Sequence, residues 1–570
     1  MYCIRYVLAL LLGLALSLGY APQNFYGVIW VFPALLLQLI WRKDCRGTQK
    51  RRFLDGFLIA FLSGLGFWVR DVAFIGAVSE KGGWMNSSGL ALYLSIYFGF
   101  YGGWAATIGR FQMRYQREFL ECRIFLYAVM HGLMWSGLEW VRGLSRVSFG
   151  WDGLGVPLVD TSFAQVADVL GVCGLSWFPV FTGALVIQTL HSFKGRLGVF
   201  MSRVPWEVIP AVLILGGAYG YGKWRLASLD ALETKPLDIL LVQQNIPLSY
   251  NWDADKSEEI YQGFAEEMTT AFSKYPSPDI VMWPESSLPE PIWVKPDGAL
   301  YEEQNNVGYF DSKVRSLGEY LFITGCNEFP LRELADKSYE LNPEGPFYNA
   351  IAFFSKGAHS YEKRPKNHLM PFGEYMPLEN FKLFQKAYKY SSGQTFGGSF
   401  TPAETFEPYL SNVEEQFCSI IPTVCYEDSV SSLVRKYVRE EPQMIVNVTN
   451  DGWFAGTSCA VKHFQNARFR AIEYRRPLAR AANTGVSGVV DIKGGIRHPE
   501  TGAKQILQDS TGGVECKGHL FGRVLLPKFP VTTFYQRFGH LLGWGGGFFM
   551  LGFTLYRLAY DRVAKGFKLS

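Results

Sequence analysis

Long apolar runs in the N-terminal part of the chain constrain its fold more than any other feature. Residues 1 to about 222 contain runs of roughly 17 to 25 residues, the helix length that crosses a hydrocarbon core about 30 Å thick. Buried helices of a large soluble protein are a weaker explanation, because such helices normally keep one polar face and these carry almost no charge. We therefore expect about eight transmembrane helices, at 5–20, 25–41, 54–77, 88–108, 120–141, 164–190, 205–222 and 540–560.

The first run has a second interpretation. Gly19-Tyr20-Ala21 has the small-x-small pattern of a signal-peptide cleavage site, and a single Arg5 precedes the apolar centre of the run. Because further apolar runs follow at once, we favour a retained span.

Basic residues in the loops orient the predicted bundle. Lys and Arg accumulate on the cytoplasmic side of membrane proteins, and here they gather in the loops 42–52, 110–123 and 194–203, while the alternate loops hold few. The N-terminus is therefore expected inside, and the polar block that follows seven crossings outside. We predict a transmembrane bundle of residues 1–222, an outer catalytic domain of residues 223–537, and a last span with a cytoplasmic tail over residues 538–570.

The overall charge points to no nucleic-acid partner. The formal net charge of +4 arises largely from the basic loops of the predicted bundle. The sequence has no HExxH motif, no Cys or His zinc spacing and no phosphate-binding glycine loop, so we expect neither a metal nor a cofactor. Five of the nine cysteines fall in the polar block without CxxC spacing, so at least one thiol there is unpaired unless it bonds another chain.

In the polar block, short apolar runs alternate with helical patterns. Helices are predicted at about 254–275, 428–438 and 460–476. This alternation is typical of an α/β domain large enough to have its own core. Buried strands are predicted at Leu237–Val242, Ile280–Trp283, Tyr320–Gly325, Ala350–Phe354, Ser419–Val424 and Met444–Val448.

Three separated segments of this block carry catalytic residue types. Glu285 lies just past a predicted strand, Lys366 lies in a loop, and Cys425 lies at a strand-to-helix junction. Taken singly, they are explained as a turn-capping Glu, a solvated Lys and a small core Cys. Together they form a base, an oxyanion stabiliser and a nucleophile, which indicates covalent catalysis. The helix start and a nearby Lys would also favour the thiolate of Cys425, although Glu427 and Asp428 oppose this.

The sequence motifs around these residues resemble those of the bacterial apolipoprotein N-acyltransferases, whose outer domain belongs to the nitrilase (carbon-nitrogen hydrolase) superfamily. In the predicted bundle the resemblance lies in Glu139-Trp140-Val141-Arg142-Gly143 and in Ala167–Gly171. In the outer block it lies in Gln244-Asn245-Ile246, Trp252, Trp283-Pro284-Glu285, His368–Tyr375, Cys425-Tyr426-Glu427, Asn450–Phe454, Ala467–Glu473 and Arg480–Gly485.

The resemblance implies a fold, a site and an activity. The fold would be an αββα sandwich joined to the bundle. The activity would be transfer of a fatty acyl chain from a membrane phospholipid to the α-amino group of the diacylglyceryl-modified N-terminal Cys of an apolipoprotein, through a thioester on the enzyme. The enzyme would lie in the bacterial inner membrane with its catalytic domain on the periplasmic side. The implied triad is Glu285, Lys366 and Cys425, and substrate-binding or supporting roles are implied for Trp252, Glu374, Tyr426 and Glu427.

One departure from the family pattern leaves the lysine open. The family usually shows Tyr-x-Lys directly before the His-Leu pair, whereas Tyr361-Glu362-Lys363-Arg364-Pro365-Lys366 offers two lysines. Counting back without gaps from Pro371 selects Lys366, and an insertion of three residues would select Lys363. We favour Lys366.

Two other functions are compatible with the sequence. A membrane-tethered amidase of the nitrilase type could use the same triad on a small amide, but it would not need eight spans. A membrane scaffold with a degenerate hydrolase domain is disfavoured, because all three triad residue types are present.

Overall fold

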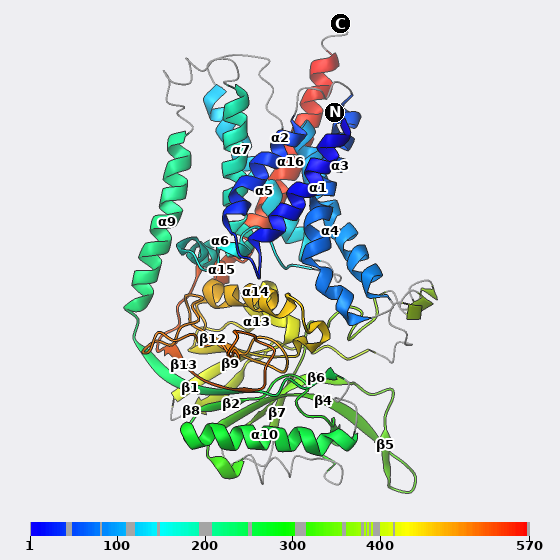
Figure 1. Cartoon of the computed structure of the whole chain (residues 1–570), viewed down its shortest axis with the longest axis vertical. Coiled ribbons are helices and arrows are strands. Elements are labelled where there is room, and N and C mark those ends of the chain that lie inside the picture. Colours follow the sequence, from blue (N-terminus) through cyan, green and yellow to red (C-terminus); the bar gives the residue numbers. More distant parts are fainter. Residues whose placement is uncertain are drawn as a thin grey trace. The chain divides into compact units, whose positions relative to one another are not determined.

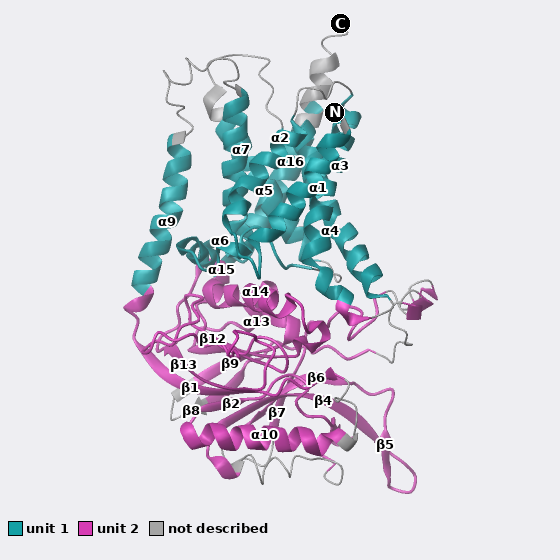
Figure 2. Ribbon diagram, in the orientation of Figure 1, with its two compact units in different colours: residues 1–76, 82–228, 537–570 teal, residues 77–81, 229–536 magenta. Residues whose placement is uncertain are grey.

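The computed structural model of this chain describes residues 2–41, 48–79, 82–109, 120–144, 149–192, 208–248, 254–301, 315–355, 361–377, 381–382, 385–386, 389–390, 399–413 and 416–566. They belong to two compact units, coloured separately in Figure 2. The helical unit comprises residues 1–76, 82–228 and 537–570, and the sandwich unit comprises residues 77–81 and 229–536.

Helices occur at each of the eight apolar runs of the helical unit (Figure 1). The short turns between them are 3-10 helices, among them η1 (Ser17–Gly19), η4 (Val156–Leu158) and η5 (Ser162–Val166). The α-helices are α1 (Tyr2–Leu16), α2 (Gly27–Ile40), α3 (Gln49–Asp71), α4 (Gly83–Thr107), α5 (Leu120–Arg142), α6 (Ala167–Leu175), α7 (Trp177–Ser192), α9 (Val208–Asp230) and α16 (Leu541–Gly566).

Glycines let the first helices of this unit pack backbone to backbone. A Cβ on Gly56 of α3 would lie 2.4 Å from the carbonyl oxygen of Gly102 on α4, and a Cβ on Gly102 would lie 2.2 Å from that of Gly56. On α1, a Cβ on Gly13 would lie 1.8 Å from the carbonyl oxygen of Ser63 on α3. Small residues at such crossings are the usual means by which helices approach closely in apolar surroundings.

The eight predicted membrane spans are not established by these helices. Among the described residues, α3 is the one unbroken helix that is both long and apolar enough to cross a membrane, with a mean hydropathy of 1.4. A second crossing is possible if η5, α6 and α7 count together as a single bent span. Apolar stretches of 10–17 residues also occur at Cys3–Gly19, Gly27–Ile40 and Leu541–Tyr556.

The predicted span over residues 164–190 is divided into two helical segments. The segment Ser162–Leu175 meets Trp177–His191 at an angle of 62°. Two local causes are visible. Gly171 has φ 70° and ψ 170° inside α6, a conformation that residues with a side chain rarely adopt. Ser176, between α6 and α7, donates from Oγ to Glu139 Oε2 over 2.6 Å and accepts from the backbone N–H of Gly155 over 2.8 Å.

Two sheets form the centre of the sandwich unit. The eight-stranded sheet has the order β13-β1-β2-β4-β6-β7, with β3 and β5 also paired to β4, and the five-stranded sheet has the order β12-β11-β10-β9-β8. The strands of the first sheet are β1 (Thr234–Gln243), β2 (Ile280–Met282), β3 (Ile292–Val294), β4 (Leu321–Glu333), β5 (Tyr339–Leu341), β6 (Tyr348–Phe354), β7 (Tyr361–Pro365) and β13 (Gly518–Pro527). Those of the second are β8 (Tyr409–Val413), β9 (Gln416–Val424), β10 (Gln443–Thr449), β11 (Leu478–Ala482) and β12 (Gly488–Val490).

Helices cover the outer face of each sheet, which gives an αββα sandwich as predicted (Figure 1). The helices are α10 (Ala254–Lys274), α13 (Ser431–Tyr437), α14 (Cys459–Tyr474) and α15 (Phe534–Phe538). Side chains alternate along each strand, so neighbouring residues enter different cores. Ile239 of β1 packs between the sheets with Ile420 of β9, whereas Leu240 packs with Phe264 of α10. On the other side, Ile445 of β10 packs with α13 and α14.

The six predicted strands and three predicted helices of this unit are all present. The predicted strands correspond to β1, β2, β4, β6, β9 and β10, and the predicted helices to α10, α13 and α14. The helix expected from residue 428 begins later, at Ser431, because Cys425–Ser429 first forms the 3-10 helix η9.

Candidate active site

Glu285 lies directly after β2, buried between the two sheets' strand ends. Its Oε1 accepts from Asn349 Nδ2 of β6 over 2.8 Å, and its Oε2 accepts from the backbone N–H of Asn450 over 2.9 Å. The thiol of Cys425 also interacts with this carboxylate and acts to lower its pKa. Burial raises the pKa of Glu285 above its ordinary value, although Lys366 and the hydrogen bonds act to lower it. The group is therefore set up to accept a proton at a pH above the usual carboxyl range.

Cys425 occupies the turn between β9 and η9 in a left-handed conformation, with φ 53°. This conformation is uncommon for a residue with a side chain, and it is held by a bond from Asn447 Nδ2 to the Cys425 carbonyl oxygen over 3.0 Å. The thiol keeps some accessible surface but is closely surrounded by protein. This burial and the Glu285 carboxylate raise the pKa of Cys425, and Lys366 lowers it less.

The sequence made a favoured thiolate depend on whether the nearby Lys dominates over the acidic neighbours of Cys425. The nearby Lys does not dominate, because desolvation of the thiolate and the negative charge of Glu285 outweigh it. The raised pKa favours the neutral thiol, which needs a base, and Glu285 is the carboxylate that interacts with it.

Lys366 follows β7 and is 1 % exposed. Its Nζ donates to the Glu374 carboxylate over 2.9 Å. Burial alone would lower the pKa of Lys366, but Glu374, Cys425 and Glu285 outweigh burial and raise it. Lys366 is therefore a permanent ammonium within the field of Cys425 and Glu285.

Lys363 lies elsewhere on β7. It pairs in register with Ala352, and its Nζ binds the buried Glu328 carboxylate, which also accepts from Tyr361 Oη over 3.0 Å. Its side chain is 36 % exposed. Of the two lysines left open by the sequence, the geometry brings Lys366 to the cluster of Glu285 and Cys425.

Glu374 and Glu427 hold the lysine segment in place. Glu374 accepts from Asn349 Nδ2 over 2.7 Å and from the backbone N–H of Met370 over 2.7 Å, in addition to its bond with Lys366. Asn349 thus joins two carboxylates, Glu285 and Glu374, with one amide group.

Glu427 ties the lysine segment to the cysteine segment. Its Oε1 accepts from the backbone N–H groups of Asn367 and His368, each over 2.7 Å, and its Oε2 accepts from that of Val424 over 2.8 Å. Burial raises the pKa of Glu427 to about 7, against the effect of Lys366. Tyr426 is buried with its ring 6.0 Å from that of His368. Trp252 lies outside the described residues.

Comparisons with known proteins give the same assignment for both units. The model of the apolipoprotein N-acyltransferase N-terminal domain matches residues 12–185, and the model of carbon-nitrogen hydrolase matches residues 241–504. An apolipoprotein N-acyltransferase of Geobacter metallireducens is 28% identical over 545 residues, which is 95% of this chain and 92% of that protein. The chain therefore resembles the apolipoprotein N-acyltransferases over almost its whole length. The relative of this name from Photobacterium profundum is 27% identical over 86% of each chain.

Among solved structures, a carbon-nitrogen hydrolase from Helicobacter pylori is similar to part of this chain. It aligns with 51% of this chain and 89% of its own, with a TM-score of 0.32 and 16% sequence identity.

Sequence reasoning missed three residues that touch the site. Asn349 is the second residue of strand β6, one residue before the predicted apolar run, so a polar residue near the start of a buried strand was the available signal. Asn450 contributes its backbone N–H, which any residue type would supply. Thr449 acts to lower the pKa of Cys425, and its side chain is fully buried. In the described ranges, no group of three or more His, Cys, Asp or Glu side chains could hold a metal ion.

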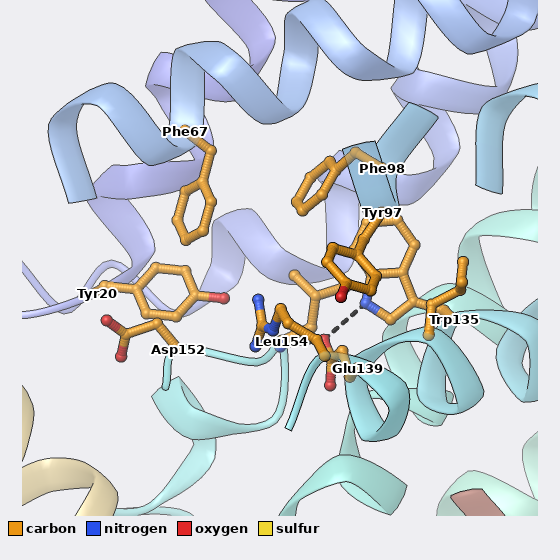
Figure 3. A pocket seen from close by; sticks show the side chains of 10 residues that line it. Tyr20, Phe67, Tyr97, Phe98, Trp135, Glu139, Asp152 and Leu154 are labelled. Atoms are coloured by element: carbon orange, nitrogen blue, oxygen red, sulfur yellow. Dashed lines mark hydrogen bonds between the residues drawn. The ribbon is translucent and has the colours of Figure 1, made fainter. Parts of the chain in front are cut away.

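The family segment at Glu139 lines a pocket inside the helical unit (Figure 3). Aromatic rings of Tyr20, Phe67, Phe98 and Trp135 form much of its wall. Glu139 is a hydrogen-bonding hub, because it accepts from Trp135 Nε1 over 2.7 Å, from the backbone N–H of Leu154 over 2.9 Å and from Ser176 Oγ over 2.6 Å. These bonds hold α5 against the 150–155 loop and against the bend between α6 and α7. A packing role is therefore enough to explain why a Glu occupies position 139.

Proposed function

We propose that the protein transfers a fatty acyl chain from a membrane phospholipid to the α-amino group of a diacylglyceryl-modified N-terminal Cys, through a thioester on Cys425. The observation that carries this proposal is the convergence of Glu285, Cys425 and Lys366, which interact electrostatically, around Asn349, whose amide binds both Glu285 and Glu374. The name shared by relatives that match almost the whole chain supports the acyl-transfer reaction.

In the first half-reaction Glu285 takes the proton of Cys425, and the thiolate attacks the ester carbonyl carbon of the phospholipid. The carbon-oxygen bond of the ester then breaks, and Glu285 returns the proton to the departing lysophospholipid oxygen. Because the resting thiol is neutral, this base is essential to the step.

Lys366 would stabilise the tetrahedral oxyanion. Its ammonium is buried and held by Glu374, so it requires little reorganisation when negative charge develops on the substrate oxygen. Glu374 in turn is fixed by Asn349 and by the backbone of Met370.

In the second half-reaction the free amine of the lipoprotein attacks the thioester carbonyl. Glu285 accepts a proton from the amine, the carbon-sulfur bond breaks, and the proton restores the Cys425 thiol. The product is an amide, and neither half-reaction requires a cofactor.

We also propose that the helical unit lies in the bacterial inner membrane and that the sandwich unit faces the periplasm. The alternation of basic and non-basic loops in the sequence supports this orientation. Single cysteines at Thr48 and at the exposed Glu259, in a chain whose other cysteines are replaced, would be treated with an impermeant maleimide in spheroplasts. Labelling at Glu259→Cys with protection at Thr48→Cys is expected, and the reverse pattern would overturn the orientation.

The activity test supplies purified protein in detergent with a phospholipid bearing a labelled acyl chain and a diacylglyceryl peptide with a free N-terminus. We expect label on the peptide that resists hydroxylamine, because an amide is stable to that reagent and a thioester is not. A peptide whose amine is acetylated is the matched control. Release of ammonia from small amides without transfer to the peptide would support the amidase alternative instead.

A further inference from the structure

Four charged side chains form a cluster in the sandwich unit behind the nucleophile. They come from four elements: Asp428 from η9, Asp451 from the 3-10 helix η10 (Asp451–Phe454), His463 from α14 and Arg480 from β11. Each is at most 4 % exposed. Charged groups buried this deeply are expected to be paired, since desolvation of an unpaired charge is costly.

The imidazole of His463 lies between the two carboxylates. Its Nε2 is 2.9 Å from Asp428 Oδ1 and its Nδ1 is 2.9 Å from Asp451 Oδ1. Arg480 binds the second oxygen of each carboxylate, through Nη1 to Asp428 and through Nη2 to Asp451 over 3.0 Å. Every carboxylate oxygen of the cluster therefore has a partner.

The cluster reaches Cys425 through Thr449 at the end of β10. Thr449 Oγ1 lies 3.4 Å from Asp451 Oδ1, and the pairing of Val448 with Val424 places Thr449 beside Cys425, whose pKa it lowers. Asp451 raises the pKa of Cys425 by its negative charge, and Arg480 also interacts electrostatically with Cys425. Asp428 follows Cys425 by three residues in the same turn.

The protonation of His463 sets the net charge of the cluster. With a neutral imidazole, two carboxylates face one guanidinium and the cluster is negative, whereas with an imidazolium the four charges cancel. Arg480 Nη2 lies 2.8 Å from His463 Nδ1, so a neutral ring could instead accept from Arg480 and donate from Nε2 to Asp428. Burial and Arg480 act to lower the pKa of His463, but Asp428 and Asp451 outweigh them and raise it above its ordinary value.

Other charged and titratable groups lie on the helices around this ring. On α14 itself, Lys462 precedes His463, and one turn earlier Cys459 is a buried thiol whose pKa is raised. Further along α14, Arg470 and Glu473 pair with each other over 2.9 Å. On α13, which also packs against α14, Arg435 donates to the Gln536 carbonyl oxygen and Lys436 lies over the Phe406 ring.

We propose that His463 is a positioning residue for the nucleophile: as an imidazolium it cancels the charge of the Asp428, Asp451 and Arg480 cluster and thereby favours formation of the Cys425 thiolate. The imidazolium also satisfies Asp451 Oδ1. The single proton of Thr449 is then available to the thiolate of Cys425 rather than to Asp451. The inference rests on the proposed role of Cys425 as nucleophile.

Alkylation of Cys425 by iodoacetamide tests this without any lipid substrate, so it is separate from the test of acyl transfer. The rate at Cys425, followed by peptide mass spectrometry from pH 6 to 9.5, is proportional to the fraction of thiolate. His463→Gln keeps a polar side chain and removes the positive charge. We expect alkylation to slow by about tenfold below the pKa of His463, the order expected for one charge change at a nearby buried group.

The difference should vanish at high pH. Because the pKa of His463 is raised, the imidazolium is present below that pKa and is lost as pH rises through it, so the wild type and His463→Gln curves should converge. The double variant Asp428→Asn with His463→Gln restores a net charge of zero and should regain the wild-type rate below that pH.

A purely structural role for His463 predicts that the double variant is at least as impaired as the single variant and that the curves stay parallel. A neutral His463 in the wild type predicts no effect of His463→Gln and faster alkylation in the double variant. Either result would overturn the proposal. His519→Gln is the matched control, because His519 also pairs with a carboxylate, Glu267 at 2.5 Å, on a different part of the sandwich.

Discussion

Gly325 of β4 lies so close to Glu285 that a Cβ placed on it would be 2.5 Å from the Glu285 Cα. The same Cβ would be 2.9 Å from the carbonyl oxygen of Pro284, which already accepts from the Gly325 N–H over 3.1 Å. The backbone that carries the proposed base therefore rests directly on the backbone of a neighbouring strand, and a side chain at position 325 would have to push it away.

Gly325→Ala should slow acyl-enzyme formation by about 10²-fold, because a shift of the base by about 1 Å is enough for a loss of that size. Phospholipid binding should change little, since the substitution adds one methyl group between two buried segments. Rapid-quench mass spectrometry of the acyl-enzyme gives the rate. Gly89→Ala, at a helix position where a Cβ meets nothing within 4 Å, should leave the rate unchanged. If Gly325→Ala formed the acyl-enzyme at the wild-type rate, the position of Glu285 would not be critical for the reaction.

The variants Lys366→Ala and Lys363→Ala test which of the two lysines stabilises the oxyanion. Loss of the buried Lys366 should reduce acyl-enzyme formation by about 10²- to 10³-fold, the usual cost of removing one oxyanion stabiliser. Lys363→Ala should keep the rate, and it should lower the melting temperature because Glu328 loses its cation. Both rates and melting temperatures are measured on the same preparations. If Lys363→Ala abolished acyl-enzyme formation and Lys366→Ala did not, the assignment of the oxyanion-stabilising lysine would be reversed.

The rate of acyl-enzyme formation should rise with pH through the pKa of Glu285. Burial raises this pKa above 4.5, so the carboxylate needed as base is lost at a higher pH than for an ordinary Glu. Asn349→Asp removes a hydrogen bond to Glu285 and adds a carboxylate beside it, and both changes should move the acid limb of the pH profile to higher pH. Asn342→Asp, in a loop beyond β5, should not move it. An acid limb of Asn349→Asp at the wild-type position or lower would contradict this electrostatic account.

Glu139→Ala tests the hub of the helical unit rather than the chemistry. The substitution leaves three donors, Trp135 Nε1, Ser176 Oγ and the backbone N–H of Leu154, without their acceptor. Each unsatisfied buried group costs about 1–3 kcal/mol, so the thermal unfolding temperature in detergent should fall by several degrees. The unfolding temperature of Glu139→Gln, which keeps one acceptor oxygen, should fall less than that of Glu139→Ala. An unchanged melting temperature for Glu139→Ala would show that these bonds add little to stability.

The sequence predicted the parts of the sandwich that are buried on both faces. The runs that became β1, β2, β9 and β10 are continuous apolar stretches, and that composition is distinctive. The strand β7 could not be predicted from the sequence, because Glu362, Lys363 and Arg364 make up most of it. Only its pairing with β6 defines it as a strand. The broken helix at residues 164–190 was also unpredictable, because Ser176 bonds to Glu139, a residue distant in sequence.

The same distinction holds at the candidate site. Glu285 and Cys425 were found because they follow apolar runs and stand in recognisable motifs. Asn349 and Gly325 were not found, since their importance comes from contacts across strands. The desolvation that raises the pKa of Cys425 could not be predicted from the sequence, because it depends on packing that local neighbours do not reveal.

The most direct test of the account is the intact mass of the purified protein after incubation with a single phospholipid species and no acceptor. The account predicts an added mass of one acyl chain on Cys425, sensitive to hydroxylamine, absent from Cys425→Ala and discharged by a diacylglyceryl peptide with a free amine. An unmodified wild-type protein, or the same adduct on Cys425→Ala, would contradict it.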